Sequence, residues 1–434
     1  MMKQFLLLIF FIPCSINLSG QENTLASKKR LDFAKTYFEL GGNLFPSFTG
    51  KRFLGNSITT FEHPGSFNPY LNWGGFHFWG HAEFYVSFPL TQLNLKRKAE
   101  TDFQLTHYVA TGARFLPWAF EEKKIRPYIG FSWSALDFKQ IIKPNEDQPT
   151  LSKDFMLVPD IGFLYGYKDF AIRIGVNYFH SNAWQYPMSK TEFEEISTPK
   201  FNLQVGLVYS FESSHDKNPE TNKKWNSYPT VSRLSLDATR FGDFFVGIGP
   251  SVSFSLAKSE YNKSDFPYLN DKLSSSTYYD IALGYQFNKA NLFSALSFRN
   301  PRYENTGYGT KQTIQKTSLA FEVSKFLTDY SGFVPYIGLN IAYDHIQYSE
   351  NTNDADRKLT FRKVEPGITV GWDILPGKTE EYLILRTNLR WYPLSSLDID
   401  NKSFDFSQLE YNLIQVVFYP GRFLKSRHKI GFNW

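Results

Sequence analysis

The sequence predicts an all-β fold that crosses a membrane as an antiparallel β-barrel, with about 16 strands in two eight-stranded repeats. Three observations support this: apolar and polar side chains alternate over many short segments, tight and long connections alternate between these segments, and the chain begins with an export signal. From Phe201 to Ser210 the odd positions are apolar, and the even positions, except Val208, are polar or glycine. A strand with one face in a core or in lipid has this period of two residues.

Residues 1–20 are expected to be a secretory signal peptide. Lys3 precedes an apolar run from Phe5 to Ile12, and small and polar residues follow, which is the order of regions in a cleaved signal. The apolar run is too short to span a bilayer as a helix. The only cysteine, Cys14, lies inside this segment, so we expect no disulfide and no cysteine-bound metal in the mature chain.

The composition argues against several classes of protein. Aromatic residues make up 18% of the chain, yet its mean hydropathy is −0.35, which is too polar for a bundle of membrane helices. A membrane β-barrel reconciles the two values, because half of each strand faces a polar interior and aromatic girdles mark the lipid interfaces. The net charge of +5 is spread along the chain, and no basic recognition helix accompanies it, so nucleic acid is not an expected partner.

The chain contains a tandem repeat. Pro-Tyr-Ile-Gly begins at Pro127 and again at Pro335, and Pro-Tyr-Leu-Asn begins at Pro69 and again at Pro267. An ordered series of matches at nearly constant offset indicates duplication. Further pairs in this series are Arg173 with Arg386 and Phe201 with Tyr411.

The repeat divides the chain into five parts. They are the signal peptide at 1–20, a first β-barrel repeat at 30–213, a polar linker at 214–232, a second β-barrel repeat at 233–424, and a C-terminal tail at 425–434 that ends in an aromatic residue. The linker is rich in Ser, Asn and Lys, as connecting segments commonly are.

Each repeat contains eight segments with the strand pattern. In the first repeat they lie near 36–48, 70–80, 82–96, 101–118, 125–140, 154–167, 169–180 and 199–212, and in the second near 243–258, 276–288, 291–300, 313–327, 334–348, 359–375, 382–394 and 408–420. The last of these is irregular, because Ile414, Gln415 and Val416 blur its alternation. Tight connections, as at 167–168, alternate with long ones, as at 181–200. Outer-membrane barrels sort their connections in this way, with short periplasmic turns and long outer loops, whereas a soluble sandwich has no reason to do so.

Each repeat resembles the eight-stranded outer-membrane β-barrel family of the OmpA/OmpX-like type, with relatives in the Bacteroidetes. The resemblance rests on strand pattern, loop order and the Pro-Tyr-Ile-Gly strand starts, and it covers nearly the whole mature chain. It implies a location in the bacterial outer membrane, contact with outer-membrane lipid and lipopolysaccharide, and folding by the barrel-assembly machinery, which the terminal aromatic Trp434 would suit. Two repeats close either as one wide barrel or as two tandem barrels. We favour one wide barrel, because it explains why one chain keeps both repeats.

The polar faces of the strands supply the candidate functional residues. In a narrow barrel these side chains would pair with one another, because unpaired buried charge is costly. In a wide barrel they would line water and favour anions. A single bulge in a strand would exchange its two faces, so that residues expected to face the interior would face lipid. The side chains expected to line the interior by this parity are Glu39, Asn43, Asp160, Arg173, Asn177, Asn202, Gln204, Arg386, Asn388 and Arg390.

A segment that begins at His180, His-Ser-Asn-Ala, is similar to a stretch of the outer-membrane lipid A deacylases, which are eight-stranded barrels. The resemblance implies catalytic roles for His180 and Ser181 with a downstream carboxylate such as Glu194. Adjacent strand residues point to opposite faces, however, and the chemistry needs the serine and its base within hydrogen-bond reach. Trp184 also stands where those enzymes have glycine. We therefore expect no catalytic residue and keep the hydrolase as an alternative.

These observations predict an outer-membrane barrel with a structural role or a passive pore or transport role. The segment from Phe76 to His81 contains two histidines among aromatic residues, but the sequence offers no third ligand for a metal beside them. The Asp-rich loops lack the residue spacing of a calcium-binding loop. We therefore expect no metal and no cofactor. A surface adhesion or secretion-accessory role, carried by the long outer loops, is the second alternative.

Overall fold

The computed structural model describes residues 34–54, 57–94, 102–141, 147–211, 219–227, 231–232, 241–270, 272–330, 332–353, 355–375 and 382–424. The expected signal peptide, residues 1–20, and the expected tail, residues 425–434, lie outside the described residues. Two short elements of the expected linker are described, α3 (Pro219–Ser227) and β15 (Val231–Ser232). Within the described ranges, no helix is long and apolar enough to cross a bilayer.

Eight strands of the first repeat close into a barrel, here called barrel 1. Each strand pairs antiparallel with the next, and β1 pairs with both β4 and β14, which closes the sheet. The segment expected at 101–118 is divided into two strands that both pair with β9, namely β7 (Asp102–His107) and β8. The short β6 (Leu93–Asn94) pairs with β4. The eight barrel strands are β1 (Lys35–Phe45), β4 (Ser66–His77), β5 (Ala82–Pro89), β8 (Ala110–Phe115), β9 (Ile125–Ile141), β10 (Leu151–Tyr167), β11 (Phe170–Tyr178) and β14 (Phe201–Phe211).

Eight strands of the second repeat close into barrel 2 in the same way. Here β16 pairs with both β17 and β27 and completes the antiparallel sheet. The eight barrel strands are β16 (Gly242–Ser255), β17 (Tyr278–Phe287), β18 (Leu292–Arg299), β20 (Thr310–Phe326), β22 (Phe333–Asn351), β23 (Asp356–Ile374), β24 (Leu383–Tyr392) and β27 (Gln408–Phe418).

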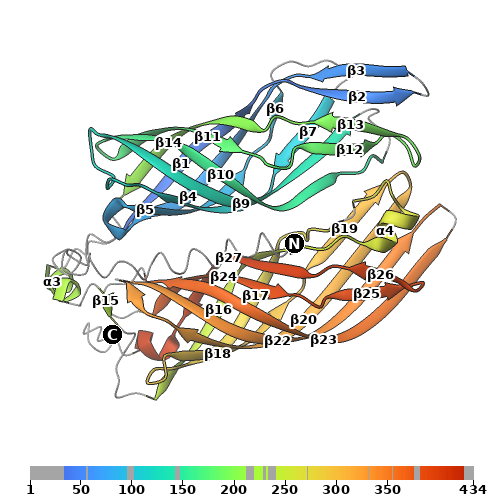
Figure 1. Ribbon diagram of the computed structural model, residues 1–434. Helices are drawn as coiled ribbons and strands as arrows, with labels where there is room; N and C mark the ends of the chain where they lie inside the picture. The colour runs from blue at the N-terminus through green and yellow to red at the C-terminus, as the bar shows by residue number, and fades with distance from the viewer. Residues whose placement is uncertain are drawn as a thin grey trace, which may run out of the picture.

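The chain therefore forms two eight-stranded barrels, which lie side by side (Figure 1). Among the described residues, no strand of one barrel pairs with a strand of the other, so our preference for a single wide barrel is wrong. Closure after eight strands leaves neither barrel with an unpaired edge in the membrane, where unpaired backbone groups are costly. The alternation within a strand does not specify which distant strand completes its sheet, and this is why the sequence left the choice open.

The outer faces of both barrels carry apolar side chains. In β14, Phe201, Leu207 and Tyr209 are 56%, 50% and 45% exposed, whereas Asn202 and Gln204 on the opposite face are buried. An outward band of exposed aliphatic and aromatic side chains around a closed barrel faces lipid. The fold is that of a transmembrane antiparallel β-barrel, which confirms the predicted fold class.

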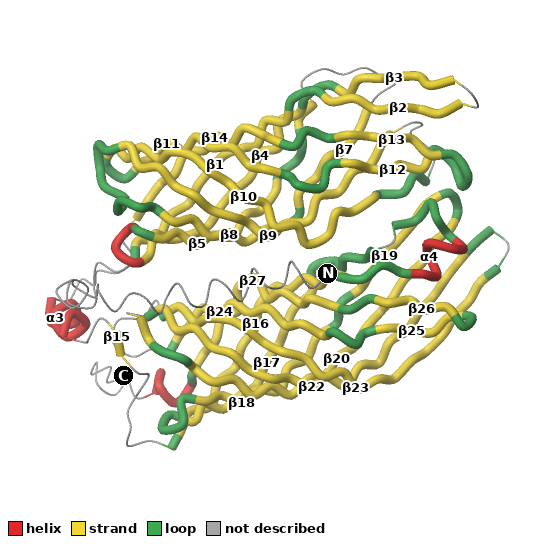
Figure 2. Tube along the Cα trace, viewed as in Figure 1, coloured by secondary structure: helices red, strands yellow, loops and turns green. Residues whose placement is uncertain are grey.

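Long connections lie at one end of both barrels and short turns at the other (Figures 1 and 2). We call these the outer and inner ends. The inner end holds the turn η3 (Phe78–Gly80) and β21 (Asp329–Tyr330). At the outer end of barrel 1, a separate four-stranded sheet in the order β12-β13-β2-β3 projects beyond the barrel. The outer elements are β2 (Phe48–Leu54), β3 (Ser57–His63), β12 (Ala183–Pro187) and β13 (Phe193–Ser197) on barrel 1, and α4 (Glu260–Asp265), β19 (Arg302–Gly307), β25 (Ser396–Ile399) and β26 (Lys402–Asp405) on barrel 2.

Candidate functional site: the two barrel interiors

The middle of barrel 1 contains a layer of five buried charged side chains, Glu39, Glu83, Arg114, Asp160 and Arg173, here called charge layer 1. Arg114 Nη1 lies 2.8 Å from Glu83 Oε1, and its Nε lies 2.6 Å from Asp160 Oδ2. Arg173 Nη2 lies 2.8 Å from the same Glu83 oxygen, and its Nε lies 3.1 Å from Glu39 Oε1. Five different strands contribute these side chains, so the ion pairs link the wall across the lumen.

Neutral side chains add hydrogen bonds to charge layer 1. Tyr70 Oη donates to Glu39 Oε1 at 3.0 Å, and Asn72 Nδ2 donates to Glu39 Oε2 at 3.1 Å. Gln204 Nε2 in turn donates to Tyr70 Oη at 2.9 Å, and Tyr37 Oη donates to Glu83. Hydrogen bonds of this kind offset part of the cost of burying a carboxylate.

A small polar space lies beyond this layer toward the outer end. Asn177 Nδ2 donates to Asn43 Oδ1 at 3.0 Å and to Asn202 Oδ1 at 2.7 Å. A cavity of about 60 Å³ has Asn43, Asn68, Asn72 and Asn177 in its lining. A cavity of this size has room for a few water molecules, and the asparagine amides in its lining offer them hydrogen-bond partners.

Apolar clusters close both ends of barrel 1. The outer cluster includes Phe45, Phe138 and Trp184, all less than 4% exposed, and residues of β2, β7, β10 and β13 complete it. The inner cluster includes Phe76 and Leu164, and Phe76 stacks on Phe120 with ring centroids 4.5 Å apart. Charge layer 1 is thus enclosed between two apolar clusters.

Barrel 2 has a corresponding layer of buried charges, here called charge layer 2. Arg386 binds Asp373 through two atoms, with Nε–Oδ1 and Nη2–Oδ2 distances of 2.7 and 2.8 Å. Arg390 Nη1 lies 2.6 Å from Asp280 Oδ2, and its Nε lies 2.5 Å from Glu322 Oε1. The remaining members of the layer are Lys316 with Asp344, Glu365 and Glu410, and Arg299 with Glu410.

Two apolar clusters enclose charge layer 2 as well. The inner cluster contains Phe293, Tyr336 and Tyr419, and the Arg386 guanidinium lies 4.0 Å from the centre of the Phe293 ring. The outer cluster contains Tyr303, with strands β25 and β26 packed over the barrel mouth. Both barrels therefore have the same layered interior.

The ten residues expected to line the interior lie as follows. Glu39, Asp160, Arg173, Asn202, Gln204, Arg386, Asn388 and Arg390 are at most 4% exposed, and Asn43 and Asn177 are half-buried. Sequence reasoning missed several of their partners. The missed residues alternate with outward apolar neighbours, as Asp373 does between Trp372 and Ile374, so the same parity would have found them. They are Glu83, Arg114, Asp280, Glu322 and Asp373.

The structure does not bring the three hydrolase candidates together. His180 is exposed, Ser181 is half-buried and Glu194 is fully buried. Within the described residues, His180 makes no hydrogen bond or ion pair with the other two. Glu194 lies on the buried face of β13, next to Ile196. Ile196 belongs to the outer apolar cluster of barrel 1. The described part of the chain also contains no group of three or more His, Cys, Asp or Glu side chains placed to hold a metal ion.

No protein-family model and no curated protein matches the chain. Among solved structures, the chain is similar to Neisserial surface protein A, with 15% identity over 41% of this chain and 99% of that chain, and a TM-score of 0.30. It is also similar to Ail, the attachment invasion locus protein of Yersinia pestis, with 11% identity over 42% of this chain and 99% of that chain, and a TM-score of 0.27. OmpT, an outer membrane protein of Vibrio cholerae, matches with 8% identity over 89% of this chain and 99% of that chain, and a TM-score of 0.16. The assignment of the fold rests on the sheet topology and the apolar outer face described above.

Proposed function

We propose that this protein is a structural outer-membrane β-barrel pair that neither conducts solutes nor catalyses a reaction. The filled interiors carry the proposal, because in each barrel paired charges lie between two apolar clusters. A solute that passed through would have to separate buried ion pairs such as Arg173–Glu83 and Arg390–Asp280. Breaking such a pair leaves an uncompensated buried charge, which is strongly unfavourable.

The proposal includes the surroundings of the protein. The exposed apolar belt suits outer-membrane lipid, with lipopolysaccharide in the outer leaflet, and the barrel-assembly machinery would insert the chain. His180 is exposed whereas Glu194 is buried beside the outer apolar cluster, and this separation argues against a catalytic triad.

Solute uptake by vesicles tests this function. The full chain is folded into lipid vesicles, and the entry of a small sugar is followed by light scattering. We expect uptake no faster than in protein-free vesicles, because buried ion pairs and apolar clusters fill the described interior of both barrels. Uptake that depends on solute size would identify a pore and would contradict the proposal.

A second candidate function is surface binding through the outer sheet of barrel 1. The four-stranded sheet projects beyond the barrel, and among the described residues its strand β3 pairs with β2 alone. Ile58 is 63% exposed on this edge strand, and an unpaired strand edge is a site at which another chain can add a strand. Cells that display the full chain are compared with cells in which residues 48–63 are replaced by a short Gly-Ser turn. Equal adhesion of the two to the same surface would exclude this role for the sheet.

A further inference from the structure

One strip of the outward face of barrel 2 is buried, although its side chains point away from the barrel interior. Val252 and Phe254 of β16 are each 4% exposed, and Leu413 of β27 is 2% exposed. Ser253, between Val252 and Phe254, faces the interior, where its hydroxyl accepts a hydrogen bond from Tyr303 at 2.7 Å. By the period of the strand, the two apolar side chains beside it face outward. Something other than lipid therefore covers them.

Barrel 1 covers this strip. Ala135 of β9, which is fully buried, belongs to the same apolar cluster as Val252, Phe254, Tyr411 and Leu413. Tyr108, Val109 and Leu389 pack against the cluster from both barrels. The contact thus joins outward faces that would otherwise both meet lipid.

A hydrogen bond crosses the contact between the barrels. Tyr411 Oη of β27 donates to Thr111 Oγ1 of β8, and the two residues are 7% and 5% exposed. Lipid chains offer no hydrogen-bond partner, so a hydroxyl on an outward face is costly unless protein satisfies it. Each barrel supplies the partner that the other one needs.

Aromatic side chains extend the contact to the inner end. Phe84 of β5 stacks on Phe333 of β22 with ring centroids 5.3 Å apart, and it lies 6.1 Å from the ring of Trp372. Phe78 in the inner turn lies 5.7 Å from the ring of Phe333. Aromatic pairs at these distances are favourable beyond the area that they bury.

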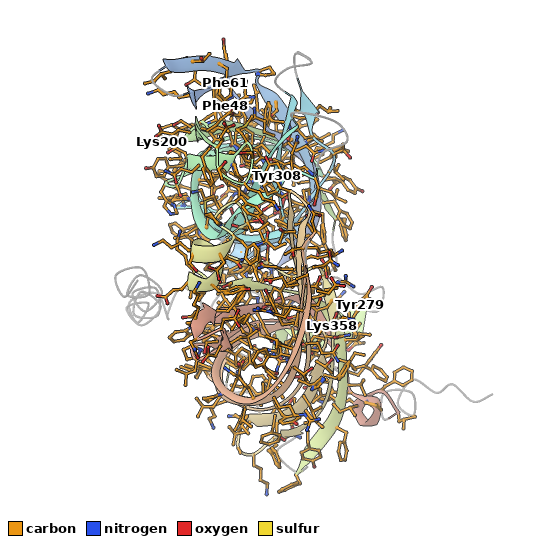
Figure 3. The ribbon with its side chains drawn as sticks, turned by 90° about the vertical axis from the view of Figure 1, so that its right-hand side faces the viewer. Phe48, Phe61, Lys200, Tyr279, Tyr308 and Lys358 are labelled. Carbon is orange, nitrogen blue, oxygen red and sulfur yellow. The ribbon has the colours of Figure 1, made fainter. Side chains whose placement is uncertain are left out.

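Hydrogen bonds from the backbone and the side chain of Tyr308 extend the contact to the outer end. Tyr308, which follows β19 of barrel 2, donates its N–H to the carbonyl oxygen of Asp147 at 2.6 Å. Its hydroxyl donates to the carbonyl oxygen of Pro187 at 2.7 Å. Figure 3 shows Tyr308 at the boundary between the two barrels. Both long-loop ends lie on the same side (Figure 1), so one bilayer accommodates both barrels in this arrangement.

We propose that the two barrels form a fixed pair in the membrane, held by a lipid-free contact between β5, β8 and β9 of barrel 1 and β16, β22 and β27 of barrel 2. The partner of this surface is the other half of the same chain. Contacts at the outer end, in the middle and at the inner end resist rotation of one barrel against the other. The linker keeps the two surfaces at high effective concentration, so even modest contact energy suffices for pairing.

Cysteine cross-linking in the membrane tests the proposal on the full chain. A site-specific protease sequence is inserted in the linker, residues 214–232, and Thr111→Cys is combined with Tyr411→Cys. After oxidation and linker cleavage, the two halves should stay joined until reduced. The control pair, Leu207→Cys with Leu296→Cys, is exposed on β14 and β18. We expect its joined fraction to be lower by about tenfold or more, because its two thiols are not held together.

A second pair, Ala135→Cys with Leu413→Cys, tests the same contact without removing the tyrosine hydroxyl. Only protein that runs as the folded band on an unheated gel is scored, so a variant that misfolds does not enter the comparison. Joining at the control level in both pairs would overturn the proposal. Disulfides between different chains, formed when single-cysteine variants are mixed, would also overturn it, because the surface would then be open to a second copy.

Discussion

Replacing Arg173 with methionine probes charge layer 1 directly. Arg173 is fully buried and contacts Glu83 Oε1 at 2.8 Å and Glu39 Oε1 at 3.1 Å. The layer contains three carboxylates and two guanidiniums, so its formal charge is −1 with Arg173 and −2 without it. Removing one partner of a buried pair typically costs about 3–5 kcal/mol. That loss is a large part of the stability of a typical domain, which is about 5–15 kcal/mol.

The assay is urea unfolding of the full chain in lipid vesicles, followed by the folded band on unheated gels. Arg302→Met is the matched control, since Arg302 lies 3.5 Å from Glu304 with both side chains about half exposed, and such surface pairs contribute about 0–1 kcal/mol. We expect Arg173→Met to lower the unfolding free energy far more than the control does. A second substitution, Glu39→Gln, should restore part of the loss because it removes an unpaired charge. Equal effects of Arg173→Met and Arg302→Met would refute this account of the interior.

Three further outcomes are expected. Gly175→Ala should cost about 1–3 kcal/mol in the same unfolding assay, because its Cβ would collide with the Tyr128 hydroxyl. Tyr128→Phe should restore part of this loss, and no recovery would place the strain elsewhere. Overexpression of the wild type or of His180→Ala should leave the mass spectrum of lipid A unchanged, whereas loss of an acyl chain with the wild type alone would establish the hydrolase. Lys311, hydrogen-bonded to Glu304, holds the pKa of that carboxyl below its usual value. The ion pair between β19 and β20 should therefore be intact at neutral pH and weaken as the pH falls through this lowered pKa. The protection factors of the hairpin amides, which correct for the intrinsic pH dependence of hydrogen exchange, should fall only under acid. Protection factors that do not change with pH would argue against the ion pair.

The sequence predicted the walls of the barrels well, because strand geometry makes side-chain direction a local property. One exception to the alternation also has a structural explanation. Val208, the one apolar residue on the polar face of its segment, is fully buried in the inner apolar cluster of barrel 1. The blurred alternation at 414–416 coincides with a shift of register between β16 and β27, where Ile248 pairs with Val416 but Ser251 pairs with Asn412. An irregularity of this kind changes which residues face inward.

Long-range pairing was not predictable from the alternation. Arg173 meets Glu39 and Glu83, which are 134 and 90 residues away along the chain, and such contacts depend on the register of several strands together. Barrel closure could not be predicted for the same reason. It depends on the pairing of β1 with β14 and not on any pattern within either strand. The contact between the barrels could not be predicted from the sequence either, because Val252 and Phe254 alternate with polar residues in the same way as side chains that face lipid.

Single-channel recording in planar bilayers tests the central claim most directly. If two sealed eight-stranded barrels are the functional form, the full chain inserted at known density gives no steady conductance above that of the bare bilayer, because ion pairs and apolar clusters fill both interiors. The folded band of the same sample confirms that the protein recorded is the folded one. Large and steady openings of the wild-type chain would contradict the account, because they require a continuous water path through the membrane.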